Sequence, residues 1–381
     1  MLRLRWSALV GLPLLFGGVA PSVKAAISVS PPLTAEPQLA SSQLLERGRS
    51  LYQSGRFAEA AEAWSAATDE YGDRGDRLYQ AWSASYLSLA YQNLGQWEQA
   101  RVAIDRSTEL LESEPLETAE EYAVLARALN ARGSLELAMG HAQAALEAWE
   151  EAERAYTAAG DDVGRLGSQI NQAQAYQTLG LYRRATVTLE AANAELQNQS
   201  DSLLKAYGLR SLGVALQVVG DLGRSEAALK QSLSIGEQLQ ATEEIAATLF
   251  ALGNTARDAN DSDRAIEYYE RAATTAVNPM TALNSRLNQM GTAIDTGQES
   301  AARSLVPEVE TLLSGLSPSR PAIYAQVNFA QSLMDLSDTD SSRTGRLLAT
   351  AVNQARTIED PRAEAHALGT LGPLYARPGR T

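Results

Sequence analysis

The chain has 381 residues and a formal net charge of -14, with 46 acidic side chains, 32 basic ones and no cysteine. Without cysteine there is no disulfide, thiolate metal site, cysteine nucleophile or lipid attachment through a cysteine. So acidic a surface repels nucleic acid and anionic lipid headgroups. The abundance of Ala, Leu, Glu, Gln and Arg is typical of a mostly helical protein.

The first segment has the features of an export signal. Arg3 and Arg5 give it a positive start, an apolar run follows, and small residues precede Ala25 at the spacing that signal peptidase requires. We predict a signal peptide over residues 1–25 and an exported protein, periplasmic or extracellular. An uncleaved N-terminal anchor is the alternative, and would be the only contact with a membrane. Residues 26–41 are predicted to form an extended Pro-rich linker.

A short phrase recurs along the chain: a glycine, an aromatic or apolar residue two places on, and a small residue five places on. It reads Gly-Arg-Phe-Ala-Glu-Ala from Gly55 and Gly-Leu-Tyr-Arg-Arg-Ala from Gly180. The period is about 40 residues. Asparagine continues the series at its end, since it tolerates the left-handed conformation of a helix-ending turn. The turn residues are Gly55, Gly95, Gly140, Gly180, Gly220 and Asn260.

Each phrase predicts the end of one helix and the start of a second. In each second helix a large residue faces the preceding helix, and a small residue three places on marks a close helix crossing. The large residues are Trp64, Ile104, Trp149, Leu189, Leu229 and Tyr269, and the small ones are Ala67, Ser107, Ala152, Ala192, Ser232 and Ala272. Trp97 is also expected in the core.

The first helix of each repeat has apolar and small residues three or four places apart, as at Leu252, Gly253 and Ala256. A single helix pair cannot bury its apolar faces, so neighbouring pairs must stack. Beyond residue 280 the pattern weakens, but helices are still predicted at 281–296, 300–313, 321–336, 341–358 and 363–375. The last is a first helix without a partner, and its apolar face suggests self-association.

These repeats resemble the tetratricopeptide repeat family, in a variant longer than its usual 34 or so residues. The resemblance implies an all-α fold, a right-handed α-solenoid of about eight helix-turn-helix units of roughly 40 residues. It covers residues 42–377, with clear units over 42–280 and degenerate units over 281–377, and leaves a tail at 378–381. It also implies a non-catalytic scaffold that binds a peptide or protein partner in the concave groove.

Two stretches, Ile170–Ala185 and Phe329–Leu333, look like the repeat region of bacterial, chiefly cyanobacterial, proteins that continue into a CHAT domain, a caspase-like peptidase module. That module is absent from this sequence. The resemblance implies either a stand-alone relative or a truncated product. It leaves a second hypothesis, in which the chain is the regulatory or sensing arm of a truncated or split CHAT-type peptidase.

Few residues suit catalysis or metal binding. His141 and His366, the two histidines, are far apart in sequence and read as solvated structural residues, and the peptidase dyad of CHAT domains requires a cysteine. The segment from Asp258 begins like a calcium loop, but Asp263 stands where the sharp-turn glycine belongs, and we predict a turn between helices. We therefore predict no enzyme activity, no cofactor and no metal.

The functional residues are instead expected on the concave face, which the first helices form. Amides there pair with the backbone of an extended ligand, and arginines bind carboxylates. Simple solubilising polarity is the alternative role for the same residues. From helical phase, the predicted partner-binding residues are Asn130, Ser134, Asn171, Gln174, Gln177, Arg210, Asn254 and Arg257.

Overall fold

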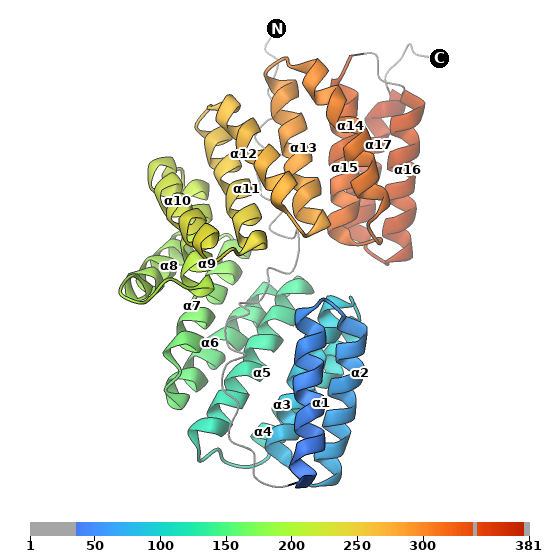
Figure 1. The fold of residues 1–381 in the computed structure, drawn as a ribbon. Coiled ribbons are helices and arrows are strands. Elements are labelled where there is room, and N and C mark those ends of the chain that lie inside the picture. Colours follow the sequence, from blue (N-terminus) through green and yellow to red (C-terminus); the bar gives the residue numbers. More distant parts are fainter. Residues whose placement is uncertain (1–35, 338–340, 377–381) are drawn as a thin grey trace. The chain divides into compact units, whose positions relative to one another are not determined.

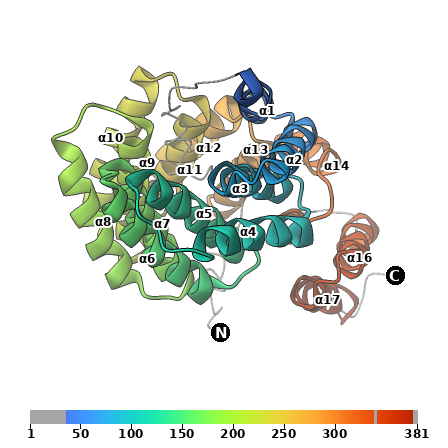
Figure 2. The same ribbon diagram turned by 90° about the horizontal axis from the view of Figure 1, so that it is seen from below.

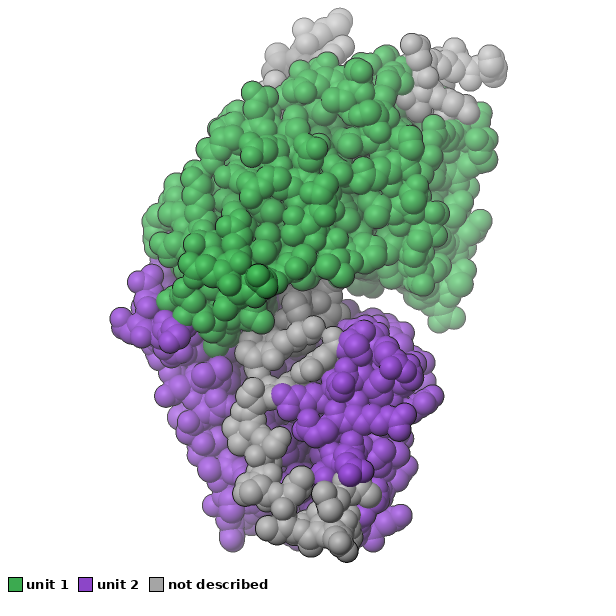
Figure 3. Space-filling model, in the orientation of Figure 1, with its two compact units in different colours: residues 1–18, 201–381 green, residues 19–200 purple. Residues whose placement is uncertain are grey.

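The structure is a computed structural model that describes residues 36–337 and 341–376, which form 17 α-helices and no strand. The chain divides after Ser200 into two compact units (Figure 3). We call their described parts the N-terminal unit and the C-terminal unit. The N-terminal unit contains α1 (Glu36–Gln53), α2 (Phe57–Asp73), α3 (Arg77–Asn93), α4 (Trp97–Glu112), α5 (Ala119–Ala138), α6 (Ala142–Ala159), α7 (Asp162–Thr178) and α8 (Tyr182–Gln197).

The C-terminal unit contains nine helices in its described residues (Figure 1). They are α9 (Leu203–Val218), α10 (Leu222–Gln238), α11 (Thr242–Asp258), α12 (Ser262–Thr275), α13 (Pro279–Asp295), α14 (Glu299–Ser314), α15 (Arg320–Asp335), α16 (Ser341–Thr357) and α17 (Pro361–Ala376). The described chain is thus eight helix pairs followed by α17, which confirms the predicted all-α repeat solenoid. The helices predicted beyond residue 280 are all present, within three residues at each end.

The turns inside the helix pairs end the first helix in the same way. Gly55 has φ 77° and Asn260 has φ 60°, as predicted for a residue in the left-handed conformation. At the first turn, the Gly55 N–H donates to Tyr52 O at 3.0 Å and the Arg56 N–H donates to Leu51 O at 2.9 Å. This pair of bonds satisfies carbonyls that the helix end would otherwise leave without donors.

Within a pair, a small residue of the first helix receives the large residue of the second helix sixteen places later. A Cβ atom placed on Gly253 would lie 2.5 Å from the Tyr269 ring, and one on Gly133 would lie 2.4 Å from Trp149 Nε1. Only glycine therefore fits at these two crossings. The predicted large and small residues of all six second helices are buried, none more than 2 % exposed.

Successive first helices pack against each other, while second helices contact mainly the first helices beside them in sequence. In the N-terminal unit α3 lies against α5, and α5 against α7; in the C-terminal unit α9, α11, α13, α15 and α17 follow one another (Figures 1 and 2). In each unit the first helices therefore form a layer in which successive helices touch, whereas the second helices do not form such a layer. We call it the first-helix layer of that unit.

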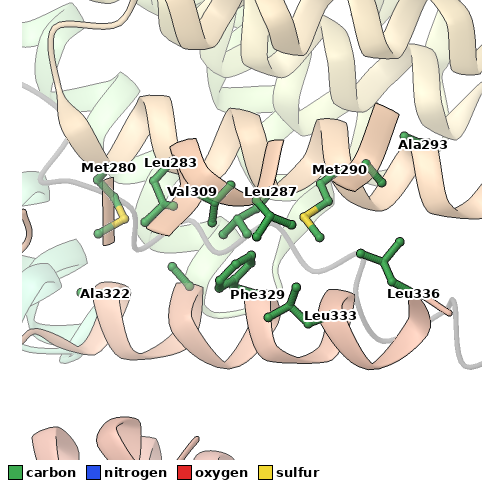
Figure 4. Close-up of a cluster of buried hydrophobic side chains, with 13 residues drawn as sticks. Met280, Leu283, Leu287, Met290, Ala293, Val309, Ala322, Phe329, Leu333 and Leu336 are labelled. Atoms are coloured by element: carbon green, nitrogen blue, oxygen red, sulfur yellow. The ribbon is translucent and has the colours of Figure 1, made fainter. Parts of the chain in front are cut away.

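The largest apolar cluster of the C-terminal unit lies where the sequence pattern is weakest. Phe329 of α15 is fully buried and points toward Leu283 and Leu287 of α13 and Val309 of α14 (Figure 4). Burying a side chain of this size stabilises a fold by about 2 to 3 kcal/mol. The degenerate repeats are therefore held by ordinary apolar packing.

Two sequence predictions differ from the structure. Helix α1 begins at Glu36, inside the segment 26–41 predicted as a linker; Pro37 falls in its first turn, where a helix tolerates proline because that N–H needs no partner. Trp97 is 37 % exposed, so its assignment to the core is wrong. It is the first residue of α4, beside the turn, where neighbouring helices cover it only in part.

The predicted signal peptide and the tail lie outside the described residues. Cleavage at Ala25 and export stay predictions. None of the helices in the described ranges combines the length and the apolarity that crossing a bilayer requires. Self-association through the last helix also stays a prediction; on that helix, α17, the Leu368 side chain is 43 % exposed.

Candidate functional site

The first-helix layer of the N-terminal unit carries a row of half-buried side chains, which we call the N-terminal stripe. It consists of Tyr79, Trp82 and Tyr86 on α3 and of Arg127 and Asn130 on α5. Ring centroids are 5.5 Å apart for Tyr79 and Trp82, and 6.0 Å apart for Trp82 and Tyr86. The three rings share one side of α3 because residues three or four places apart lie one above another on a helix.

Arg127 joins the two helices of this stripe. Its Cζ atom lies 5.3 Å from the centroid of the Trp82 ring, within the range of a cation-π contact. Arg127 Nε and Trp82 Nε1 are both buried, and neither has a hydrogen-bond partner among the described residues. No carboxylate of the described chain forms an ion pair with Arg127. The stripe therefore presents donors without acceptors.

Asn130 connects neighbouring helices one turn further along α5. Its Oδ1 accepts a hydrogen bond from Asn171 Nδ2 of α7 at 2.8 Å, and its carbonyl oxygen accepts bonds from Trp149 Nε1 and Ser134 Oγ at 3.2 and 3.1 Å. The structure thus brings the predicted residues Asn130, Ser134 and Asn171 together. Ser134 and Asn171 are themselves buried, so Asn130 is the member of this group that solvent reaches.

The two glutamines predicted on α7 differ in exposure. Gln174 is half-buried on the same side of the helix as Asn171. Gln177 is only 5 % exposed, and its Nε2 has no hydrogen-bond partner among the described residues. Gln174 is therefore placed to meet a ligand, while Gln177 lacks the exposure that direct contact would need.

The phenol of Tyr79 is a neutral donor at physiological pH. Burial raises the pKa of Tyr79 to about 12, and the nearby Glu120 carboxylate adds to this rise. The Tyr79 hydroxyl donates to Glu120 Oε1 at 3.4 Å, at the edge of the stripe. Glu120 is exposed at the start of α5, two helical turns before Arg127.

The first-helix layer of the C-terminal unit carries a different row, which we call the C-terminal stripe. It consists of the half-buried residues Asn284 and Asn288 on α13 and Tyr324, Asn328 and Gln331 on α15. Asn288 Nδ2 donates to Asn254 Oδ1 of α11 at 3.0 Å, and Gln331 Nε2 donates to Thr370 Oγ1 of α17 at 3.4 Å. These bonds run between successive first helices.

The three partner-binding residues predicted in the C-terminal unit already have partners. Arg210 Nε donates to Glu244 Oε1 at 2.7 Å, and Arg257 Nη2 lies 3.2 Å from Asp258 Oδ1. Asn254 is buried and accepts a bond from the Tyr269 hydroxyl at 2.7 Å. A ligand carboxylate would have to displace an existing ion pair at either arginine, which makes them weaker candidates than the sequence suggests.

Several stripe residues were not among the predicted ones. Trp82 and Tyr86 follow Tyr79 at helical spacing, and Arg127 precedes the predicted Asn130 by three residues, so helical phase alone could have identified them. Asn284, Asn288 and Asn328 escaped because the repeat pattern is weak in this part of the chain.

The histidines form no catalytic pair. His141 Nδ1 lies 2.8 Å from Glu136 Oε2, and the ring is exposed. His366 of α17 stacks on Tyr324 with ring centroids 4.6 Å apart, so the prediction of a solvated His366 is wrong in part. The segment around Asp258 is a turn between α11 and α12, as predicted. The described residues contain no cluster of His, Asp and Glu suited to a metal ion.

Comparisons with known proteins agree with the repeat fold. Residues 246–276, which include most of α11, the following turn and all of α12, match the family model described as the tetratricopeptide repeat. No curated protein matches the chain. The relation to CHAT-domain proteins is tested by none of these matches and stays a prediction.

Solved structures of similar fold cover most of the chain. A Rap protein complexed with competence and sporulation factor has 12 % identity and a TM-score of 0.58, over 88 % of this chain and 97 % of that one. The apo form of RapI has 10 % identity, the same two coverages and a TM-score of 0.56. The apo quorum sensor NprR from B. thuringiensis has 11 % identity and a TM-score of 0.52, over 89 % of this chain and 100 % of NprR. The family model thus identifies a tetratricopeptide repeat at residues 246–276, and the solved structures show a similar fold over most of the chain.

Proposed function

We propose that this protein is a scaffold that binds a peptide, or an extended segment of a protein, along its first-helix layers. The observation that carries the proposal is the C-terminal stripe, where half-exposed carboxamides stand on neighbouring first helices. A carboxamide both donates and accepts hydrogen bonds, as a peptide backbone does. The Rap structure cited above was solved with competence and sporulation factor, and NprR is a quorum sensor, which fits this proposal.

The spacing of the C-terminal stripe suits an extended chain. Packed helices lie about 8 to 10 Å apart, and an extended peptide advances about 3.3 Å per residue. A peptide crossing the layer would therefore meet a new first helix about every third residue. Asn284 on α13 and Asn328 on α15 would then hold backbone groups three residues apart, with side chains between them free to differ.

The scaffold role needs no chemistry from the protein. We propose that it is non-catalytic and acts outside the cytoplasm, where the predicted signal peptide would deliver it. The acidic composition favours partners with basic segments and disfavours nucleic acid.

Selection from a random peptide display library against the full chain tests the proposal. The selected peptides should bind Asn284→Ala and Asn328→Ala about 5- to 150-fold more weakly, since each change removes a hydrogen bond of about 1 to 3 kcal/mol from a desolvated site. Asn353→Ala is the matched control, because Asn353 is exposed on the second helix α16. Selection of no peptide, or equal binding by all three variants, would contradict the proposal.

A further inference from the structure

The N-terminal unit has a hollow of about 510 Å³ beside its second helix α2, which we call the α2 hollow. One wall is α2, and the other is the end of α3 with the turn that follows it. None of its described lining residues belongs to the N-terminal stripe. A space of this size takes several side chains from one face of a partner. The described lining includes Ala58, Ala61, Glu62, Ser65 and Asp69 on α2, and Tyr91, Leu94 and Gln96 on the other wall.

Large apolar side chains are exposed at the α2 hollow. Leu94 is 38 % exposed, and Trp97, which comes directly after the lining residue Gln96, is 37 % exposed. Tyr91 lines the hollow and is half-buried. Tryptophan and tyrosine are enriched among the residues that contribute most to protein–protein binding. The hollow therefore has the apolar surface that a protein partner would cover.

The α2 hollow also carries negative charge that the described chain does not neutralise. Glu62 and Asp69 are exposed, and neither forms an ion pair with a described residue. By contrast, Glu59 on the same helix pairs with Arg56. No Lys or Arg is among the described lining residues. Such a surface attracts basic side chains and repels acidic ones, so the partner that complements it is both apolar and basic.

The spacing of the two carboxylates indicates the form of that partner. Glu62 and Asp69 are seven residues apart on α2, which is about two helical turns, or about 10.5 Å along the helix axis. We infer that the α2 hollow docks a helix of a partner protein that carries Lys or Arg at the same spacing, beside apolar residues. A helix lying along α2 has the same rise per residue, so its two basic side chains meet both carboxylates. The small side chains of Ala58, Ala61 and Ser65 let such a helix approach closely.

A helix fits the α2 hollow better than an extended chain does. An extended chain exposes backbone N–H and C=O groups that need partners, and the described lining offers few donors to its carbonyls. A helix satisfies its own backbone and presents only side chains. The inference is independent of the proposed function, because it concerns a different surface and a different kind of partner.

Selection from a display library of amphipathic helices, randomised on one face, against the full chain tests the inference. The dissociation constant of the most enriched helix is then measured by calorimetry with the wild type and two double variants. Glu62→Gln with Asp69→Asn removes both carboxylates of the hollow and keeps their shape. The matched control is Asp263→Asn with Glu270→Gln, which removes two exposed carboxylates of the same spacing from the second helix α12. All four positions are exposed, and circular dichroism checks that both double variants are folded.

The enriched helix should carry Lys or Arg at the spacing of Glu62 and Asp69. It should bind the wild type and the control variant equally, and the hollow variant about tenfold or more weakly, because close charge pairs are desolvated in an interface. Leu94→Ser should weaken binding severalfold, since it removes an exposed apolar contact. Asn284→Ala and Asn328→Ala should bind the helix as the wild type does.

Recovery of no binding helix, or of helices without basic residues at that spacing, would overturn the inference. So would equal binding by the hollow variant and the control. If peptides from the random library lost affinity in the hollow variant, the hollow would take an extended chain and the helix would be wrong. If the wild type formed a dimer in sedimentation that the hollow variant did not form, the occupant would be a second copy and not a partner protein. The effects of Asn284→Ala and Asn328→Ala on random-library peptides test the proposed function separately.

Discussion

The fit between a first-helix glycine and a second-helix ring predicts the effect of one added methyl group. At Gly253 the new Cβ of Gly253→Ala would lie 2.5 and 2.6 Å from two atoms of the Tyr269 ring. Real Cβ contacts are about 1 Å longer, so the ring or the helix must move. The ring cannot move freely, because the Tyr269 hydroxyl donates to Asn254 Oδ1 at 2.7 Å and the side chain is fully buried.

The magnitude follows from a matched substitution. Replacing glycine by alanine inside a helix stabilises it by about 0.5 to 1 kcal/mol. Gly291 of α13 has no atom within 4 Å of the position of an added Cβ, so Gly291→Ala should show that gain alone. Gly253→Ala has the same gain offset by overpacking of about 1 to 3 kcal/mol. The two variants should therefore differ by about 1 to 3 kcal/mol in free energy of unfolding.

Urea denaturation followed by far-ultraviolet circular dichroism measures this difference. A second test replaces the Tyr269 ring. The corresponding crossing of α7 and α8 pairs Ala173 with Leu189, so alanine packs there beside leucine. In a Tyr269→Leu background, Gly253→Ala should therefore lower the free energy of unfolding less than it does beside Tyr269. Equal stability of Gly253→Ala and Gly291→Ala would refute the packing scheme.

Three further predictions concern stability. Trp64→Ala should lower the free energy of unfolding by about 3 to 5 kcal/mol, because it empties a buried crossing, while the exposed Gln143→Ala should change it little; equal thermal melts would contradict this. Burial lowers the pKa of His366, so the unfolded chain binds a proton before the folded one, and stability should fall as pH drops below about 6.5. His366→Phe should remove this contribution to the pH dependence of stability between pH 7.5 and 5.5. Denaturation midpoints measured at pH steps of about 0.5 test this, and the same pH dependence in the variant and the wild type would argue against it. Thr118→Ala breaks the capping box with Glu121 and should cost about 0.5 to 2 kcal/mol in the same assay, whereas no loss would mean that the cap is dispensable.

The fold was predictable because its determinants repeat. One turn glycine or one large residue is weak evidence, but six copies at a period of about 40 residues identify helix pairs, and Asn260 at φ 60° continues the glycine series. Predictions failed where context outweighed the pattern. Trp97 is a large aromatic residue of the kind found in protein cores, but it occupies the first position of α4 and stays partly exposed. Pro37 suggested a linker, although the first turn of a helix accepts proline.

The candidate site was less predictable, since partners in it are one repeat apart. Arg210 binds Glu244 on the next first helix, 34 residues along the chain, and helical phase gives no register between two helices. Helical phase could have placed Arg127 on the same face as Asn130, but it could not show that neighbouring helices leave Arg127 Nε without an acceptor. Phase placed Asn130 and Asn171 on the first-helix face, but it did not predict the hydrogen bond that joins them across 41 residues.

Site-specific cross-linking tests most directly whether the first-helix layer is the binding surface. The chain has no cysteine, so Asn288→Cys on α13 and Asn353→Cys on α16 can each be labelled with a photoreactive maleimide and irradiated with a selected peptide. The first-helix position should cross-link the peptide, and excess unlabelled peptide should abolish the product, while the second-helix position should give none. Equal cross-linking at both positions, or a product at Asn353→Cys alone, would contradict the assignment.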